Sequence, residues 1–157
     1  MKIFGKNGNM KINAFFKKYM TIERFQKFYT FDGGKELHKQ VITRNPNIFC
    51  RDGFSMSVQV GESLYSTPKG YAERYKEAEI GYPSERESLI EEYAENIWEE
   101  ECDYTDTVYP YVRCEIIDMV IEKHGGIDEV AVQEKMSSKF HEHLKERNAR
   151  KSRQTVA

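Results

Sequence analysis

The sequence has few of the features that mark secreted or membrane proteins. Its three cysteines, Cys50, Cys102 and Cys114, are widely spaced and form no CxxC pair, so we predict reduced thiols in a cytosolic protein. No apolar run approaches the roughly 18 residues that a membrane span needs. The first residues lack the apolar core and the small-residue cleavage site of a signal peptide. We therefore expect a cytoplasmic protein without a membrane partner.

Familiar catalytic patterns are also missing. There is no GxSxG motif and no Walker-type glycine loop. His141 and His143 are two residues apart on a predicted helix, so their side chains point about 200° apart and do not readily share an ion. We predict no catalytic residues, no cofactor and no metal site. One enzymatic alternative stays open, in which Tyr65, Tyr82 and Glu79 line a polar pocket.

Charge is abundant but unevenly distributed along the 157 residues. Residues 1–51 hold eleven Lys and Arg against three acids, a net charge of +8. Residues 52–138 hold seven against twenty-one, a net charge of −14, and residues 139–157 hold six against two, a net charge of +4. Such a basic, acidic, basic order lets the segments attract one another within one chain or between copies, or present separate faces to partners.

The centre of the chain alternates between apolar and polar residues, as half-buried strands do. In residues 54–60, Phe54, Met56, Val58 and Val60 share one face. Asp52-Gly53 predicts a hairpin with residues 48–51, and Pro110 places a further strand at an edge or ends it there. The predicted fold class is α+β, a single domain with an antiparallel sheet of three to four strands packed with helices. The strands are expected at 48–51, 54–60, 75–80 and 107–112, and the helices at 84–97, 115–124 and 128–147.

The two ends of the chain are expected to be helical. Apolar residues at 12, 15, 16, 19, 22, 25, 28 and 29 have helical spacing and predict one or two amphipathic helices. A short helix is expected at 35–41, and residues 1–11 allow either a small hairpin at Asn7-Gly8 or a frayed terminus. We divide the chain into a basic, aromatic, helical arm (1–44), an α+β core (45–126) and a C-terminal helix with a basic, disordered tail (127–157).

Several motifs of the core are similar to those of a family of small uncharacterised phage and prophage proteins. They include Asn45-Pro46-Asn47, the strand 52–59, Tyr65-Ser66-Thr67-Pro68 and, most specifically, Glu79-Ile80-Gly81-Tyr82-Pro83-Ser84. The resemblance covers about residues 45–126. It implies an accessory protein made inside an infected or lysogenic bacterium. It implies no activity and transfers no catalytic residues.

These observations favour a non-enzymatic protein that acts by binding another protein, such as a host factor. Ten acids between Glu85 and Asp106 form either a solvated face or a surface that mimics nucleic acid or docks a basic protein. The alternative is a nucleic-acid-associated protein that uses the basic arm and tail and binds weakly. Exposed aromatic rings also predict self-association into a dimer. The predicted interaction surface comprises Phe15, Phe16, Tyr19, Tyr65, Tyr82, Glu91 and Glu95.

Overall fold

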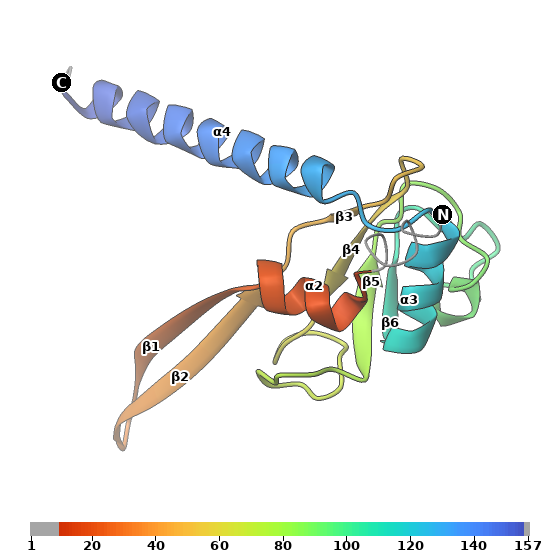
Figure 1. Ribbon diagram of the computed structural model, residues 1–157. Helices are drawn as coiled ribbons and strands as arrows, with labels where there is room; N and C mark the ends of the chain where they lie inside the picture. The colour runs from red at the N-terminus through yellow and green to blue at the C-terminus, as the bar shows by residue number, and fades with distance from the viewer. Residues whose placement is uncertain (1–9, 156–157) are drawn as a thin grey trace.

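A four-stranded antiparallel sheet of order β3-β4-β5-β6 lies at the centre of the computed structural model, which describes residues 10–155 (Figure 1). The elements of the body are α2 (Ile12–Tyr19), β3 (Ile48–Phe49), β4 (Ser55–Gln59), β5 (Glu77–Gly81), the 3-10 helix η1 (Glu91–Tyr93), β6 (Val108–Arg113) and α3 (Cys114–Lys123). Two further strands, β1 (Thr21–Phe31) and β2 (Gly34–Arg44), form a separate hairpin, and α4 (Glu129–Thr155) ends the described chain. The α+β prediction is confirmed.

Alternation along β4 decides which face of the sheet is buried. Met56 and Val58 are fully buried, whereas Ser55, Ser57 and Gln59 are partly exposed on the opposite face. Because side chains alternate across a strand, only one face can join the core. The predicted strands of the body are all present, with β6 at the sheet edge as Pro110 requires.

Two short helices close the buried face of the sheet. Helix α3 follows β6 directly, and its Ile117 and Val120 are fully buried beside Ile12 and Phe15 of α2. The backbone N–H of Ile12 donates to Asp118 Oδ1 of α3 at 2.8 Å. This bond satisfies a donor that the first turn of α2 would otherwise leave unpaired. The predicted α3 is confirmed. It ends at Lys123 with His124 as its C-cap, and Gly125 and Gly126, both at positive φ, follow.

The prediction of helix over residues 12–29 is wrong after Tyr19. Residues 21–31 instead form β1, which pairs along its whole length with β2, so the short helix expected at 35–41 is also absent. The segment is rich in aromatic and β-branched residues, which favour strands. Asp32-Gly33-Gly34 supplies the turn, and its Gly34 has a φ of 139°. The arm 1–44 is therefore helical only over α2 among its described residues, and any hairpin at Asn7-Gly8 lies outside the described part of the chain.

The helix expected from Ser84 is not formed. A capping box needs the Glu87 carboxylate to reach back to the Ser84 N–H. Instead the Ser84 N–H donates to the Ser55 carbonyl at 2.8 Å, and the Glu87 carboxylate accepts from the Leu89 N–H at 2.9 Å. Residues 84–107 consequently follow an irregular path with only η1 as regular structure.

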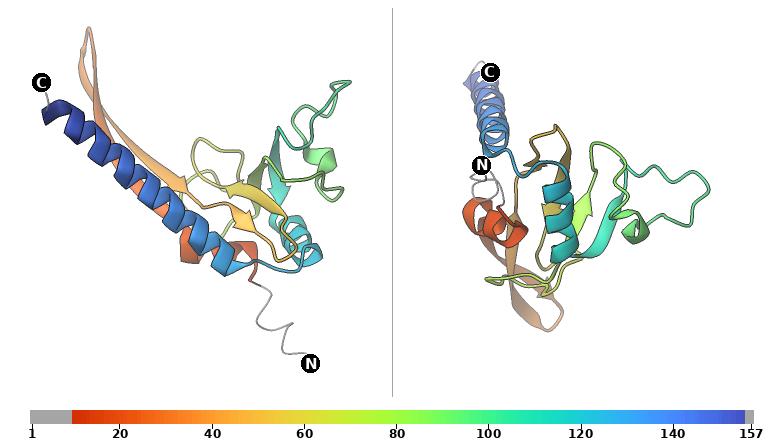
Figure 2. Two further views of the ribbon diagram at one scale, coloured as in Figure 1. Left: turned by 90° about the horizontal axis from the view of Figure 1, so that it is seen from above. Right: turned by 45° about the vertical axis from the view of Figure 1, so that its right-hand side comes forward.

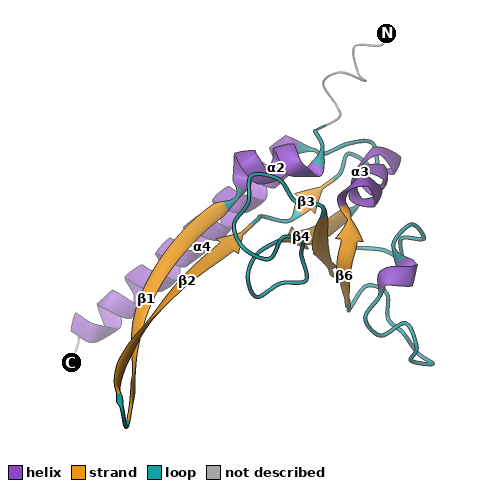
Figure 3. Ribbon diagram, turned by 90° about the horizontal axis from the view of Figure 1, so that it is seen from below, coloured by secondary structure: helices purple, strands orange, loops and turns teal. Residues whose placement is uncertain are grey.

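Two arms leave the body on the same side and diverge from each other, as Figure 1, the left view of Figure 2 and Figure 3 show. One is the β1–β2 hairpin, whose residues from Glu23 to Gln40 are almost all exposed. The other is α4, which packs on the body only through its first turns, where Val132 is fully buried. Helix α4 continues to Thr155, beyond the expected end near Arg147, so most of the predicted disordered tail is helical.

Candidate functional site

One face of the hairpin carries positive charge around an apolar pair. Partners across the two strands share a face, so Phe28 and Leu37 lie opposite each other near the tip. Their exposed fractions are 64% and 40%. We call this the cationic face, and its members on the same side of the ribbon are Ile22, Arg24, Gln26, Phe28, Thr30, Lys35, Leu37, Lys39, Val41 and Thr43. It includes three cations and no acid.

The opposite face of the hairpin is mixed in charge. The ring of Tyr29 packs edge-on against His38 at 4.6 Å, and the Lys27 ammonium lies 5.5 Å from the Tyr29 centroid. Together with Phe25 and Ile42 these side chains line a shallow hollow of about 380 Å³. Glu23 and Glu36 also fall on this face, so it lacks the single sign of the cationic face.

Helix α4 extends an apolar stripe from the core out into solvent. Val132 is fully buried, whereas Met136, Phe140 and Leu144 are 37%, 62% and 37% exposed. A spacing of four residues keeps them on one side of a helix. We call Met136, Phe140 and Leu144 the α4 stripe. A basic segment follows it, with Lys145, Arg147, Arg150, Lys151 and Arg153 against Glu146.

The residues predicted to form an interaction surface are not brought together. Phe15, Phe16 and Tyr19 are at most 8% exposed, because the hydrophobic side of α2 covers the sheet, so their assignment to a surface is corrected. Tyr65 and Tyr82 are exposed, and Glu91 and Glu95 lie at or near the surface. Further exposed rings lie on the hairpin and on α4. Exposure could be assigned to them only once the strand pairing was known.

Tyr65, Tyr82 and Glu79, considered above as the lining of a polar pocket, each make contacts with neighbouring strands and loops. The Tyr65 backbone N–H donates to Glu79 Oε2 at 3.1 Å, and the Tyr65 ring packs against Tyr111 at 5.7 Å. The Tyr82 N–H donates to the Thr107 carbonyl at 3.1 Å, on the β6 side of β5. The Glu79 carboxylate is thus used in a hydrogen bond to the backbone of Tyr65.

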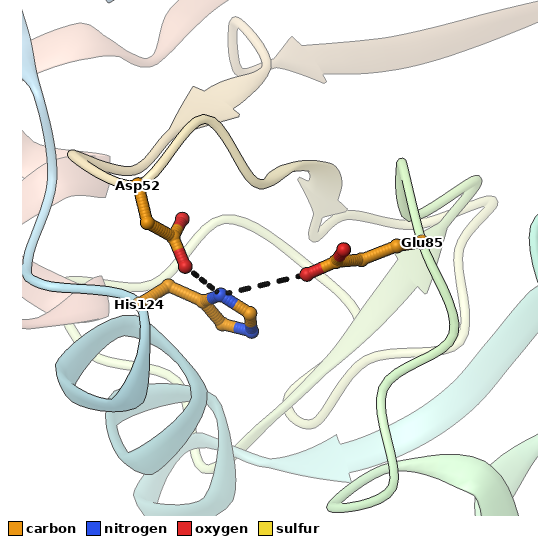
Figure 4. A group of neighbouring side chains, drawn as sticks. All are labelled: Asp52, Glu85 and His124. Carbon is orange, nitrogen blue, oxygen red and sulfur yellow. Dashed lines mark hydrogen bonds and ion pairs between the residues drawn. The ribbon is translucent and has the colours of Figure 1, made fainter.

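A cluster around His124, which sequence reasoning missed, joins three carboxylates and a lysine in the body. Nε2 of His124 lies 2.6 Å from Glu87 Oε1, and Nδ1 lies 2.6 Å from Asp52 Oδ2 and 3.9 Å from Glu85 Oε1 (Figure 4). The Phe54 ring stacks on the imidazole with centroids 4.0 Å apart. Since His124 ends α3 while the carboxylates come from the β3–β4 turn and the segment after β5, only the tertiary fold unites them.

Burial and hydrogen bonding act in opposite directions on the ionisable groups of this cluster. Burial alone would lower the pKa of His124, but the bonds to Glu87 and Asp52 outweigh it and raise that pKa above the usual value. Burial alone would raise the pKa of Glu87, yet the Leu89 N–H, Lys123 and His124 together lower it. The Phe54 N–H and then His124 lower the pKa of Asp52. The cluster therefore favours the protonated form of His124 and the ionised forms of Glu87 and Asp52 more than water does.

Asp52, Glu85 and His124 also satisfy the first requirement of a cation site. One ligand atom from each lies within 4.8 Å of the others. Glu85 and Asp52 have exposed side chains, whereas that of His124 is only 7% exposed. Carboxylate oxygen and imidazole nitrogen are ligands for Zn²⁺ and other divalent transition metals.

Comparison of the chain with protein-family models, with curated proteins and with solved structures finds no match in any of the three. No helix among residues 10–155 is long and apolar enough to cross a lipid bilayer.

Proposed function

We propose that this chain is an accessory binding protein whose two arms bind another protein. The surface of that partner has an apolar centre surrounded by acidic residues. The observation that supports this proposal best is the pairing of Phe28 with Leu37 on the cationic face. Both are exposed and lie side by side, Lys35 and Lys39 belong to the neighbouring pairs on the same face, and Arg24 follows one pair farther from the tip. Exposed apolar side chains that are grouped together on a surface usually mark a site where a partner binds and covers them.

The chemistry of the arms favours a protein over nucleic acid as the partner. Bases stack on aromatic rings, but they gain little from aliphatic side chains. The exposed apolar residues here include Leu37, Met136 and Leu144 besides the rings. Aromatic, methionine and arginine side chains are enriched at protein interfaces. In line with the resemblance of residues 45–126, we place the protein in the cytoplasm of a bacterium carrying a phage or prophage, with a host protein as the target.

A photo-crosslinking experiment tests this proposal directly. A photoreactive phenylalanine is placed at Phe28 or at Phe140, and the control is placed at Trp98. Trp98 is 94% exposed and belongs to the loop after η1, which projects from the other side of the body (Figure 2). We expect one discrete protein adduct from each arm position and none from Trp98. Excess wild-type protein should suppress the adduct, whereas a Phe28→Ala/Leu37→Ala variant should not.

The other possible occupants give different results in the same experiment. If the partner were nucleic acid, nuclease treatment would destroy the crosslinked adducts. Binding would also weaken steeply as the salt concentration increases. A second copy of this chain would give an adduct of twice the mass, reproduced with purified protein alone. Equal adducts from all three positions would show that the arms have no special role, and the proposal would be abandoned.

Nucleic acid remains the second candidate because of one specific observation. The last described turns of α4 carry five cations between Lys145 and Arg153 with a single acid among them. A basic helix end that projects into solvent can follow a phosphate backbone. A gel-shift titration with duplex and single-stranded probes at low salt would decide it, because no shift there removes the candidate.

A further inference from the structure

We infer that Asp52, Glu85 and His124 form a binding site for a divalent transition-metal ion, with Zn²⁺ as the best fit. The three side chains come from three separate parts of the chain and converge on one point (Figure 4). The inference is independent of the partner proposed for the arms.

The imidazole of His124 is held as a metal-binding histidine usually is. Its Nε2 meets the Glu87 carboxylate at 2.6 Å, and the Glu87 side chain is only 1% exposed. Metal-binding histidines commonly donate their second ring N–H to a carboxylate, which fixes the tautomer and the ring orientation. With Nε2–H committed to Glu87, the lone pair of Nδ1 is the one left for a metal. Phe54 stacks on the ring and prevents it from turning away.

Glu87 is itself held in place by groups outside the proposed ligand set. Lys123 Nζ donates to its Oε2 at 2.9 Å, and the Leu89 N–H donates to the same oxygen at 2.9 Å. Glu87 therefore serves as a positioning residue on the far side of the ring from the metal. Its burial makes this support rigid.

The two ligand carboxylates need only small adjustments to reach a metal geometry. Ligand atoms about 2.0–2.1 Å from a tetrahedral Zn²⁺ lie about 3.3–3.4 Å from one another. Asp52 Oδ2 and Glu85 Oε1 lie 2.6 and 3.9 Å from Nδ1, one slightly too close and the other slightly too far. Their side chains are 46% and 62% exposed, so both can shift within the space available. A water molecule would complete a tetrahedral coordination.

Charge balance in the cluster also favours a divalent ion. Three carboxylates (Asp52, Glu85 and Glu87) lie around the His124 ring, whereas Lys123 is the one lysine that pairs with them. A divalent cation would balance this local excess of acidic groups. The ligand set of one nitrogen and two oxygens suits Zn²⁺ better than Ca²⁺ or Mg²⁺, which prefer oxygen alone.

The test uses the full-length, chelator-treated protein and Zn²⁺ alone as the probe. The background carries His38→Gln, His141→Gln and His143→Gln, because these three exposed histidines offer adventitious nitrogen ligands. Calorimetry at slightly alkaline pH, where protons compete less, should report one equivalent bound. Nitrogen NMR of the imidazole should show the metal on Nδ1 and the proton on Nε2 of His124.

Glu85→Gln is the decisive variant. Within residues 10–155 the one interaction of the Glu85 side chain is its 3.9 Å approach to His124, so the fold should survive the substitution. We expect its Zn²⁺ affinity to fall at least tenfold, whereas Glu95→Gln, which neutralises an exposed acid elsewhere, should bind as before. Three results would overturn the inference. They are no saturable binding, binding that disappears with the surface histidines, and binding that Glu85→Gln leaves unchanged.

Discussion

Nε2 of His124 lies 2.6 Å from Oε1 of Glu87, although the two residues are 37 positions apart, and both side chains are buried. The contact ties the end of α3 to the segment that follows β5. It also explains why Glu87 does not cap a helix, because its carboxylate is used in tertiary contacts with His124 and Lys123.

Glu87→Gln should therefore destabilise the fold strongly. The substitution keeps the shape but removes the buried negative charge between His124 and Lys123, so that His124 retains only the half-exposed Asp52 carboxylate; the loss should cost about 3 kcal/mol. Urea unfolding at neutral pH measures the difference. Glu91→Gln is the matched control, because Glu91 pairs with Arg86 at the surface and such pairs contribute little. Equal unfolding midpoints for the two variants would contradict a structural role for the Glu87–His124 pair.

Phe15 and Phe28 should respond oppositely to truncation. Phe15 is fully buried on α2, so Phe15→Ala should cost about 3–5 kcal/mol of unfolding free energy. Phe28 is 64% exposed on the hairpin, so Phe28→Ala should leave stability nearly unchanged while it weakens crosslinking through the arm. Thermal unfolding of both variants checks this. A large loss of stability with Phe28→Ala would mean that the hairpin packs on the body.

Gly61 occupies a position that does not accommodate a side chain. Its φ is 146°, and a Cβ there would lie 2.5 Å from Thr43 Oγ1, which donates to the buried carbonyl of Val60. Gly61→Ala should cost about 1–3 kcal/mol through backbone strain and the disturbed hydrogen bond. Gly70→Ala is the control, since its Cβ would meet nothing within 4 Å. If both variants unfold at the same urea concentration, the close approach at Gly61 has no energetic consequence.

Glu129 should make the attachment of α4 pH-dependent. It accepts from Lys18 Nζ at 2.6 Å and from the Tyr19 hydroxyl at 2.7 Å, and these bonds hold its pKa below the usual value of 4.5. A carboxyl with a lowered pKa in the folded state stabilises above its unfolded pKa and loses that contribution as the pH falls through the folded value.

The matching measurement is urea unfolding of the wild type and of Glu129→Gln at neutral pH and near pH 3. The variant should be less stable than the wild type at neutral pH, and the difference should become smaller in acid. Glu134→Gln, farther along the exposed part of α4, should match the wild type at both pH values. A difference for Glu129→Gln that persists undiminished in acid would assign the effect to packing rather than to charge.

Local features of the sequence were enough to predict the sheet and α3. Alternation over residues 54–60 specifies a half-buried strand wherever the chain places it. Gly125 and Gly126 follow the C-cap of α3 and adopt positive φ, which few other residues tolerate. Pro110 restricts β6 to an edge, since it has no N–H to donate. Each of these predictions depends on residues within one segment.

Contacts between segments that are distant in the sequence decided the other features of the fold. The residues after Tyr19 fit a helical spacing, yet pairing of β1 with β2 satisfies their backbone groups as a hairpin, so rings expected against a core point into solvent. Ser84 and Glu87 make a sound capping box by local rules, but a buried carboxylate gains more from His124 and Lys123 than from a helix N-terminus. Asp52 and His124 meet across 72 positions, and no local pattern encodes such a contact. The sequence alone therefore determined the strands and caps that depend on neighbouring residues, whereas the fold decided which surfaces are exposed and where the polar cluster forms, because both depend on contacts between distant segments.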